Sequence, residues 1–164
     1  MSTYTAVHVV ISLIGIGSGL VVLAGFLTGR SLEAWTRVFL ASTVATSLTG
    51  FGFPVDRVLP SHIVGGLSLV ALGVAIYARY ARHMAAGWRT AYVLTAMLSL
   101  YLNVFVGVVQ SFIRIPPLHA LAPTQSEGPF ALAQFVVLIA FLALTIVALR
   151  KFKAGAATVR NAVA

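Results

Sequence analysis

Apolar residues in this chain form long runs separated by short segments that hold the charges and most of the prolines. Runs at about residues 6–28, 61–78, 91–113 and 130–149 contain no Asp, Glu, Lys or Arg. A membrane-crossing helix needs about 20 mostly apolar residues. A fifth run, 38–53, is shorter and more polar, with hydroxyl side chains at Ser42, Thr43, Thr46, Ser47 and Thr49. The pattern predicts an all-α transmembrane bundle of five spans, because exposed backbone polar groups find no partner in hydrocarbon.

The distribution of basic residues favours counting 38–53 as a span. If it crosses, two basic residues (Arg57 and Arg114) lie on one side, and the other side holds the remaining nine: Arg30, Arg37, Arg79, Arg82, Arg89, Arg150, Lys151, Lys153 and Arg160. If it does not cross, the division is seven to four. Positive charges concentrate on the cytoplasmic side of membrane proteins. We therefore expect the N-terminus outside and the C-terminus inside.

Composition agrees with membrane residence. The 164 residues are 60% hydrophobic and 9% charged, with a mean hydropathy of +1.01, whereas soluble domains carry about 25% charged residues. The net charge of +8 does not indicate nucleic-acid binding, since the basic residues flank apolar runs. Cysteine is absent, which excludes disulfides and Cys-ligated metal sites. We expect one transmembrane domain, residues 1–152, and a cytoplasmic tail, residues 153–164.

Small and polar residues inside the spans are expected to mediate helix packing. Gly15 and Gly19 form a GxxxG pair in the first span, and Gly66 and Gly73 share a face of the third. In the fourth span, spacings of four and seven align a polar face that should turn toward protein, made of Ser99, Asn103 and Gln110. A rival interpretation makes this face, with the hydroxyls of 38–53, the lining of a small channel or transporter.

Histidines provide the candidate cofactor ligands. His8 and His62 lie near the outer starts of the first and third spans, at similar depth. If these helices are neighbours, the two imidazoles could hold a b-type haem. Alternatively, His8, His62 and His119 could form a transition-metal site, with Asp56 or Glu127 as a further ligand. The third hypothesis is that these histidines only hydrogen-bond to nearby loops.

No catalytic signature accompanies these residues. The sequence lacks HExxH, GxSxG and Walker motifs, and no carboxylate lies inside a span. The chain is therefore expected to be a non-enzymatic accessory or structural component, with the redox protein and the transporter as alternatives. Its expected partners are the lipid bilayer and a second copy or another membrane protein.

The loop before the last span contains a capping signal. Residues 124–127 (TQSE) have the Ser/Thr-x-x-Glu form of a capping box, and Ser126 is an alternative N-cap with Pro129 in the first turn.

Three parts of the sequence carry a resemblance: residues 100–106 (LYLNVFV) with Gln110, 120–127 (ALAPTQSE), and 59–62 (LPSH) with Val64 and Gly65. In these parts the chain resembles a group of small bacterial inner-membrane proteins that are usually labelled only as hypothetical membrane proteins. The likeness extends over residues 8–152 and departs from the group at Gly128, where proline is usual. The resemblance implies a multi-pass protein of the bacterial inner membrane and implies no activity.

Overall fold

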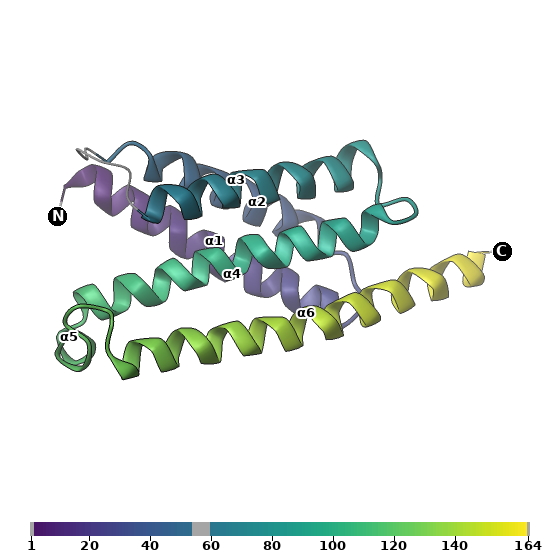
Figure 1. The fold of residues 1–164 in the computed structure, drawn as a ribbon. Coiled ribbons are helices and arrows are strands. Elements are labelled where there is room, and N and C mark those ends of the chain that lie inside the picture. Colours follow the sequence, from purple (N-terminus) through teal and green to yellow (C-terminus); the bar gives the residue numbers. More distant parts are fainter. Residues whose placement is uncertain (1, 54–59, 164) are drawn as a thin grey trace.

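The chain forms a bundle in which each long helix runs antiparallel to the long helix before it (Figure 1). This computed structural model describes residues 2–53 and 60–163, with side chains over 2–53 and 61–152. Its helices are α1 (Thr3–Leu27), α2 (Glu33–Gly50), α3 (Pro60–Ile76), α4 (Trp88–Arg114), the short α5 (Pro116–Leu121) and α6 (Gly128–Val163). A π-helical turn, η1 (Tyr77–Ala81), extends α3. The described residues contain no strand, which confirms the all-α prediction.

Four helical segments are long and apolar enough to cross a membrane. They are α1, α3 with η1 (Ser61–Ala81), α4, and the Gly128–Phe152 part of α6. Most of the run 38–53 is also helical, in α2 (Glu33–Gly50), which is not among these four. Its hydroxyls and its two charged residues, Glu33 and Arg37, lower its hydropathy. The fifth crossing remains a prediction.

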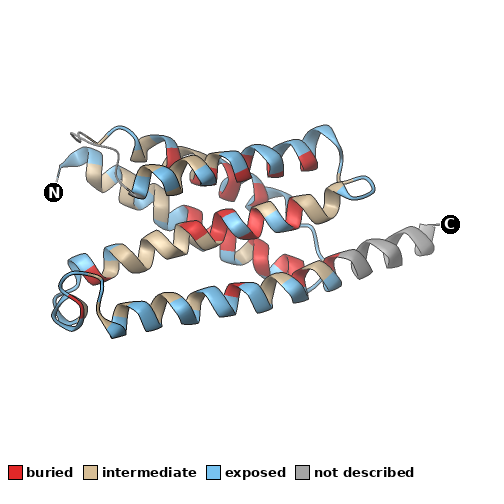
Figure 2. Cartoon of the chain, viewed as in Figure 1, coloured by how far each residue is buried: buried red, intermediate tan, exposed pale blue. Residues whose placement is uncertain are grey.

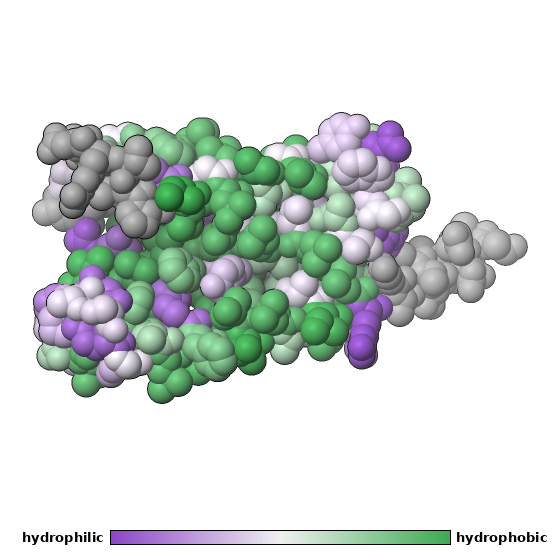
Figure 3. All heavy atoms as spheres, in the orientation of Figure 1, coloured by the Kyte–Doolittle hydropathy of each residue, from purple (hydrophilic) through white to green (hydrophobic). Residues whose placement is uncertain are grey.

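Helix α4 is the central element, because it packs against α1, α2, α3 and α6. Helix α2 packs against α1 on one side and α3 on the other. The buried residues lie along these contacts (Figure 2), and α6 turns much of its surface outward. On the face shown in Figure 3, apolar side chains cover the middle of the molecule and hydrophilic ones gather toward its two ends. This distribution is expected of a helical bundle whose middle section is surrounded by lipid.

Of the two glycine pairs predicted to mediate helix packing, the pair on α1 (Gly15 and Gly19) lies at a close contact between helices. An added Cβ at Gly19 would lie 2.5 Å from Leu100 Cδ1 and 2.9 Å from the Phe39 ring, so α1, α2 and α4 meet there. Gly66 and Gly73 do not mediate packing within the described part of the chain, since an added Cβ at either meets nothing there within 4 Å. Both glycines face away from the other described helices.

The start of α6 differs from the predicted cap. The Ala131 amide donates to the Glu127 carbonyl at 3.1 Å, so Glu127 holds the N-cap position. Its carboxylate accepts the Thr124 amide at 3.1 Å and the Ser126 amide at 3.0 Å. The predicted Thr124–Glu127 pairing therefore exists, but it closes a loop that precedes the helix. Helix α6 then continues past Phe152, through the segment expected to form the tail, to Val163.

Candidate functional site

His8 lies near the start of α1, at the end of the bundle where α2 terminates. Its Nδ1 is 2.7 Å from Thr49 Oγ1, and its ring packs edge-on against Phe53 with the centroids 5.1 Å apart. The Tyr4 hydroxyl donates to the Thr49 carbonyl at 2.6 Å. These contacts tie α1 to the end of α2, as expected of a histidine with a packing role.

His62 belongs to a different contact at the same end. Its ring stacks on Phe51, with centroids 5.5 Å apart and planes 15° apart. The Phe51 ring also fits against Gly65, whose added Cβ would lie 3.3 Å from it. The expected similar depth of His8 and His62 fits the structure, because both lie beside the C-terminal end of α2.

The structure does not show the facing helices that a bis-histidine haem needs. Helix α2 packs against both α1 and α3, and α1 and α3 are not a closely packed pair among the described residues. Phe51 and Phe53, which follow α2, already cover one ring each. The haem hypothesis thus gains no support from this geometry.

His119 does not join the other two histidines. It lies on α5, and its Nδ1 is 3.3 Å from the Phe112 carbonyl. Among the side chains that the structure describes, those of residues 2–53 and 61–152, no three from His, Cys, Asp or Glu lie close enough to hold a metal ion. Glu127 is engaged by its own loop, and Asp56 lies outside the described residues.

The predicted polar face divides between the interior and the surface. Ser99 is fully buried and donates to the Thr95 carbonyl at 2.9 Å. Asn103 reaches across to α2, where its Nδ2 is 3.4 Å from Thr43 Oγ1. Gln110 is exposed and accepts from Arg114 Nε at 3.1 Å. The structure brings Ser99 and Asn103 into the bundle and leaves Gln110 outside.

Asn103 and Thr43 meet where a third helix comes very close. An added Cβ at Gly15 of α1 would lie 2.9 Å from Asn103 Nδ2 and 3.2 Å from Thr43 Oγ1. Ser42 beside them donates to the Val38 carbonyl of its own helix at 2.6 Å. These polar groups form hydrogen bonds and direct contacts, as small and polar residues do where membrane helices pack together.

The most unusual polar cluster was not predicted from the sequence. Arg79, in η1, has a side chain only 4% exposed. Its Nη2 donates to the Glu33 carboxylate at the start of α2 and to Ser31 Oγ at 3.1 Å. Its guanidinium carbon lies 5.1 Å from the centroid of the buried Tyr92 ring. One arginine therefore joins the beginning of α2, the end of α3 and the beginning of α4.

The π-helical turn explains how a basic residue at the end of an apolar run turns inward. In η1, Ala78 and Arg79 are buried, whereas Tyr77 and Tyr80 are exposed. Such turns alter the direction of side chains and are common at functional sites. One sequence feature could have indicated this pair. On the side of the membrane predicted to be cytoplasmic, Glu33 is the one carboxylate among many arginines.

Glu33 serves as the shared partner of this cluster. Its carboxylate also lies 3.7 Å from Arg37 Nε, and it accepts the Tyr80 hydroxyl at 3.4 Å. Its side chain is 49% exposed, so water reaches the anion while the cation is enclosed. The arrangement compensates a buried charge, and no group in it is placed as a nucleophile beside a general base.

Comparison with known proteins adds no assignment: no family model, curated protein or solved structure matches this chain.

Proposed function

We propose that this chain is a non-enzymatic accessory or structural component of the bacterial inner membrane. It crosses the membrane five times, with the N-terminus outside and the C-terminus in the cytoplasm. The observation that carries the proposal is that polar side chains inside the bundle join one helix to another, at the Asn103–Thr43 and Arg79–Glu33 pairs. The resemblance to small bacterial inner-membrane proteins supports the location.

Helix α2 supports the fifth crossing by where its two ends lie. Glu33, its first residue, meets Arg79 at the end of α3, and Thr49, near its last, meets His8 at the start of α1. The helix thus extends between the two ends of a bundle whose other long helices have membrane character. Its 18 residues span about 27 Å at 1.5 Å per residue, close to the thickness of a hydrocarbon core.

The charges at the two ends support the orientation. We define the basic end of the bundle as the α1–α2 connection with the start of α2 (residues 33–37), the region from η1 to the start of α4, and α6 near Phe152. Aromatic contacts among Phe26, Tyr92 and Phe152 hold these segments together. The described side chains there include seven basic residues: Arg30, Arg37, Arg79, Arg82, Arg89, Arg150 and Lys151. Arg114 ends α4 at the opposite end. The positive-inside rule then puts the basic end in the cytoplasm.

Close packing favours a structural role over a polar path. Asn103 and Thr43 bond to each other at the point where Gly15 leaves no room for a methyl group. Ser18, Ser42 and Ser99 donate to carbonyls four residues earlier in their own helices. A conducting path needs polar groups that exchange partners with a passing solute, and these groups are already paired.

A flux assay in liposomes tests this proposal. The purified protein should give no proton or potassium flux above that of protein-free liposomes. Asn103→Leu changes the interior polar contact, and Gln110→Leu is the matched control because Gln110 is exposed. A flux that Asn103→Leu abolishes and Gln110→Leu preserves would replace the structural role with a polar path.

Two further measurements test the other parts of the proposal. The purified protein should show no Soret band, and a band that disappears in His62→Ala would establish a haem protein instead. A fluorescent protein fused to the C-terminus should be active in the cytoplasm. Activity of alkaline phosphatase at the same position, which requires export, would overturn the orientation and the odd number of crossings.

A further inference from the structure

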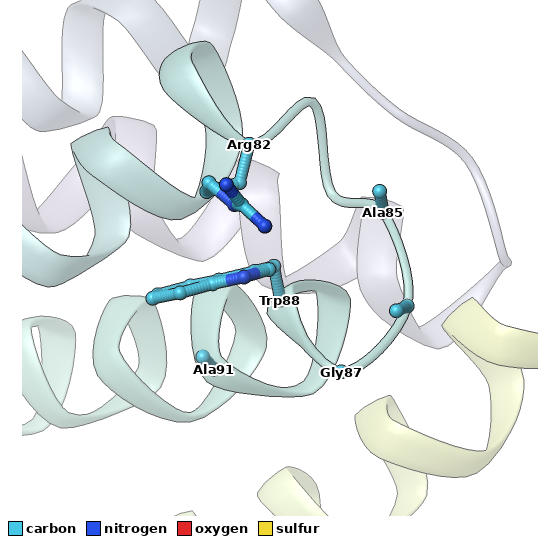
Figure 4. Close-up of a pocket in the computed structure, with 6 residues that line it drawn as sticks. Arg82, Ala85, Gly87, Trp88 and Ala91 are labelled. Carbon is cyan, nitrogen blue, oxygen red and sulfur yellow. The ribbon is translucent and has the colours of Figure 1, made fainter.

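An open pocket lies at the basic end, between the end of η1 and the first turns of α4. It has a volume of about 330 Å³ and is lined by Arg82, Ala85, Ala86, Gly87, Trp88 and Ala91. The volume falls at the lower end of the range for small-molecule sites, about 300–1,000 Å³. Figure 4 shows the Arg82 guanidinium above the plane of the Trp88 indole, with small residues around them.

The lining combines one cation with an apolar surface. The Arg82 guanidinium carbon lies 5.5 Å from the centroid of the Trp88 ring, and Tyr77 packs edge-on against the same ring at 5.2 Å. These contacts hold the cation beside the pocket, and the alanines and the indole provide no acidic group. A matching ligand has an anionic group next to an apolar body.

Charges around the pocket leave Arg82 unneutralised. Glu33 is engaged by the buried Arg79, and Arg82 forms no ion pair within the described part of the chain. Arg89, next to Trp88, adds positive charge, although its guanidinium packs over the Phe152 ring at 5.5 Å. The pocket is therefore electropositive without a competing carboxylate nearby.

The position of the pocket identifies the source of such an anion. It lies where apolar helix surface gives way to a basic loop, and Tyr77, Tyr80 and Trp88 are placed there as interfacial aromatic residues are. Lipid phosphates occupy that depth of a bilayer, and arginines near helix ends bind anionic headgroups. An anion with attached acyl chains fits this location.

The loop backbone is consistent with a site that is held in a fixed shape. His83, Met84 and Ala86 have φ values of 48°, 56° and 48°, in the left-handed region that non-glycine residues seldom adopt. Strain of this kind is concentrated at ligand-binding segments.

We propose that this pocket binds the headgroup of one anionic phospholipid, with the phosphate against Arg82 and the glycerol region over Trp88 and Ala91. The proposal depends on membrane residence and is independent of the orientation and of the structural role proposed above.

Trp88 provides a direct readout of occupancy. The chain has two tryptophans, so Trp35→Phe leaves Trp88 as the single tryptophan of the full-length protein, and its emission is followed with excitation selective for tryptophan. Titration of the detergent-solubilised protein with phosphatidylglycerol should change Trp88 fluorescence saturably, and phosphatidylcholine should not. Native mass spectrometry should show one phosphatidylglycerol retained per chain.

Two variants and one control locate the site. Arg82→Gln should shift the titration midpoint at least tenfold, and Ala91→Leu should do so by filling the pocket without changing its charge. Arg150→Gln removes one exposed positive charge at the same end and should leave the midpoint within twofold. The midpoint is compared, because Arg82→Gln also changes the unliganded fluorescence of Trp88.

Three results would overturn the proposal. Equal weakening by Arg82→Gln and Arg150→Gln would indicate diffuse attraction to a charged surface. Saturation by inorganic phosphate with the same midpoint as phosphatidylglycerol would indicate an anion site that does not select lipid. A phosphatidylglycerol midpoint unchanged by both Arg82→Gln and Ala91→Leu would place lipid binding elsewhere.

Discussion

Glu33→Gln tests whether the buried Arg79 depends on its anionic partner. Glutamine has nearly the same shape as glutamate, so the substitution removes the charge and keeps most of the packing. Arg79, 4% exposed, then remains enclosed with its charge uncompensated. It retains the Ser31 hydroxyl and the face of the Tyr92 ring as partners.

The size of the effect follows from the exposure of the two partners. Breaking a fully buried ion pair by removing one partner costs about 3–5 kcal/mol. Exposed pairs contribute about 0–1 kcal/mol. Because Glu33 is 49% exposed and Arg79 is not, we expect an intermediate loss of about 2 kcal/mol. At about 2–4 °C per kcal/mol for a chain of this size, Tm should fall by about 4–8 °C.

Thermal unfolding in detergent, followed by circular dichroism, measures this loss, and a double variant isolates its cause. Arg79→Met removes the buried charge and leaves a half-exposed carboxylate, so adding Glu33→Gln to Arg79→Met should cost little more. An unchanged Tm in Glu33→Gln would refute the reasoning. So would losses that simply add in the double variant, because additivity means the two groups do not interact.

Other predictions concern the helix contacts and the loop before α6. Gly19→Ala should lower stability by about 1–3 kcal/mol through overpacking, whereas Gly73→Ala, which faces open space, should cause no loss in the same unfolding assay. A double-mutant cycle of Asn103→Leu and Thr43→Val should give a coupling energy of about 0.6 kcal/mol, and a value of zero would contradict the hydrogen bond. Desolvation would raise the pKa of Glu127, but hydrogen bonds from its loop outweigh it and lower the pKa below the ordinary 4.5. Protection of the amides bound to this carboxylate against hydrogen exchange should therefore be complete above about pH 4.5, be lost as the pH falls through the lowered pKa, and be absent at all pH values in Glu127→Gln.

The four strongly apolar helices could be predicted because span hydropathy is a local property of about 20 residues. Helix α2 was harder to classify, since its hydroxyls reduce that signal even though it packs inside the bundle. Its boundaries were also shifted: the helix starts at Glu33 rather than near residue 38, because Glu33 and Arg37 continue the same helix beyond the apolar run. A prediction based on uncharged, apolar runs therefore leaves out the first turn of α2, because that turn contains charged residues.

Which face of an apolar helix meets protein could not be predicted from spacing. Gly15 and Gly19 on α1 and Gly66 and Gly73 on α3 are similar small-residue patterns, yet the first pair lies at a helix contact and the second faces outward. When a helix is apolar all round, periodicity no longer distinguishes its faces. The histidines show the same limit, because depth along a helix can be read from sequence, whereas the choice of neighbouring helix is a tertiary property.

Arg79 and Arg82 show why counting charges predicts topology and not chemistry. The two residues are three positions apart and count equally in the positive-inside comparison. The π-helical turn buries Arg79 against Glu33, while Arg82 stays at the surface over Trp88. Their substitutions should therefore affect different quantities. Arg79→Met should change Tm and leave the midpoint of the phosphatidylglycerol titration unchanged, and Arg82→Gln should shift that midpoint with little effect on Tm. If both variants changed both quantities alike, the basic end would act as one undifferentiated charged surface.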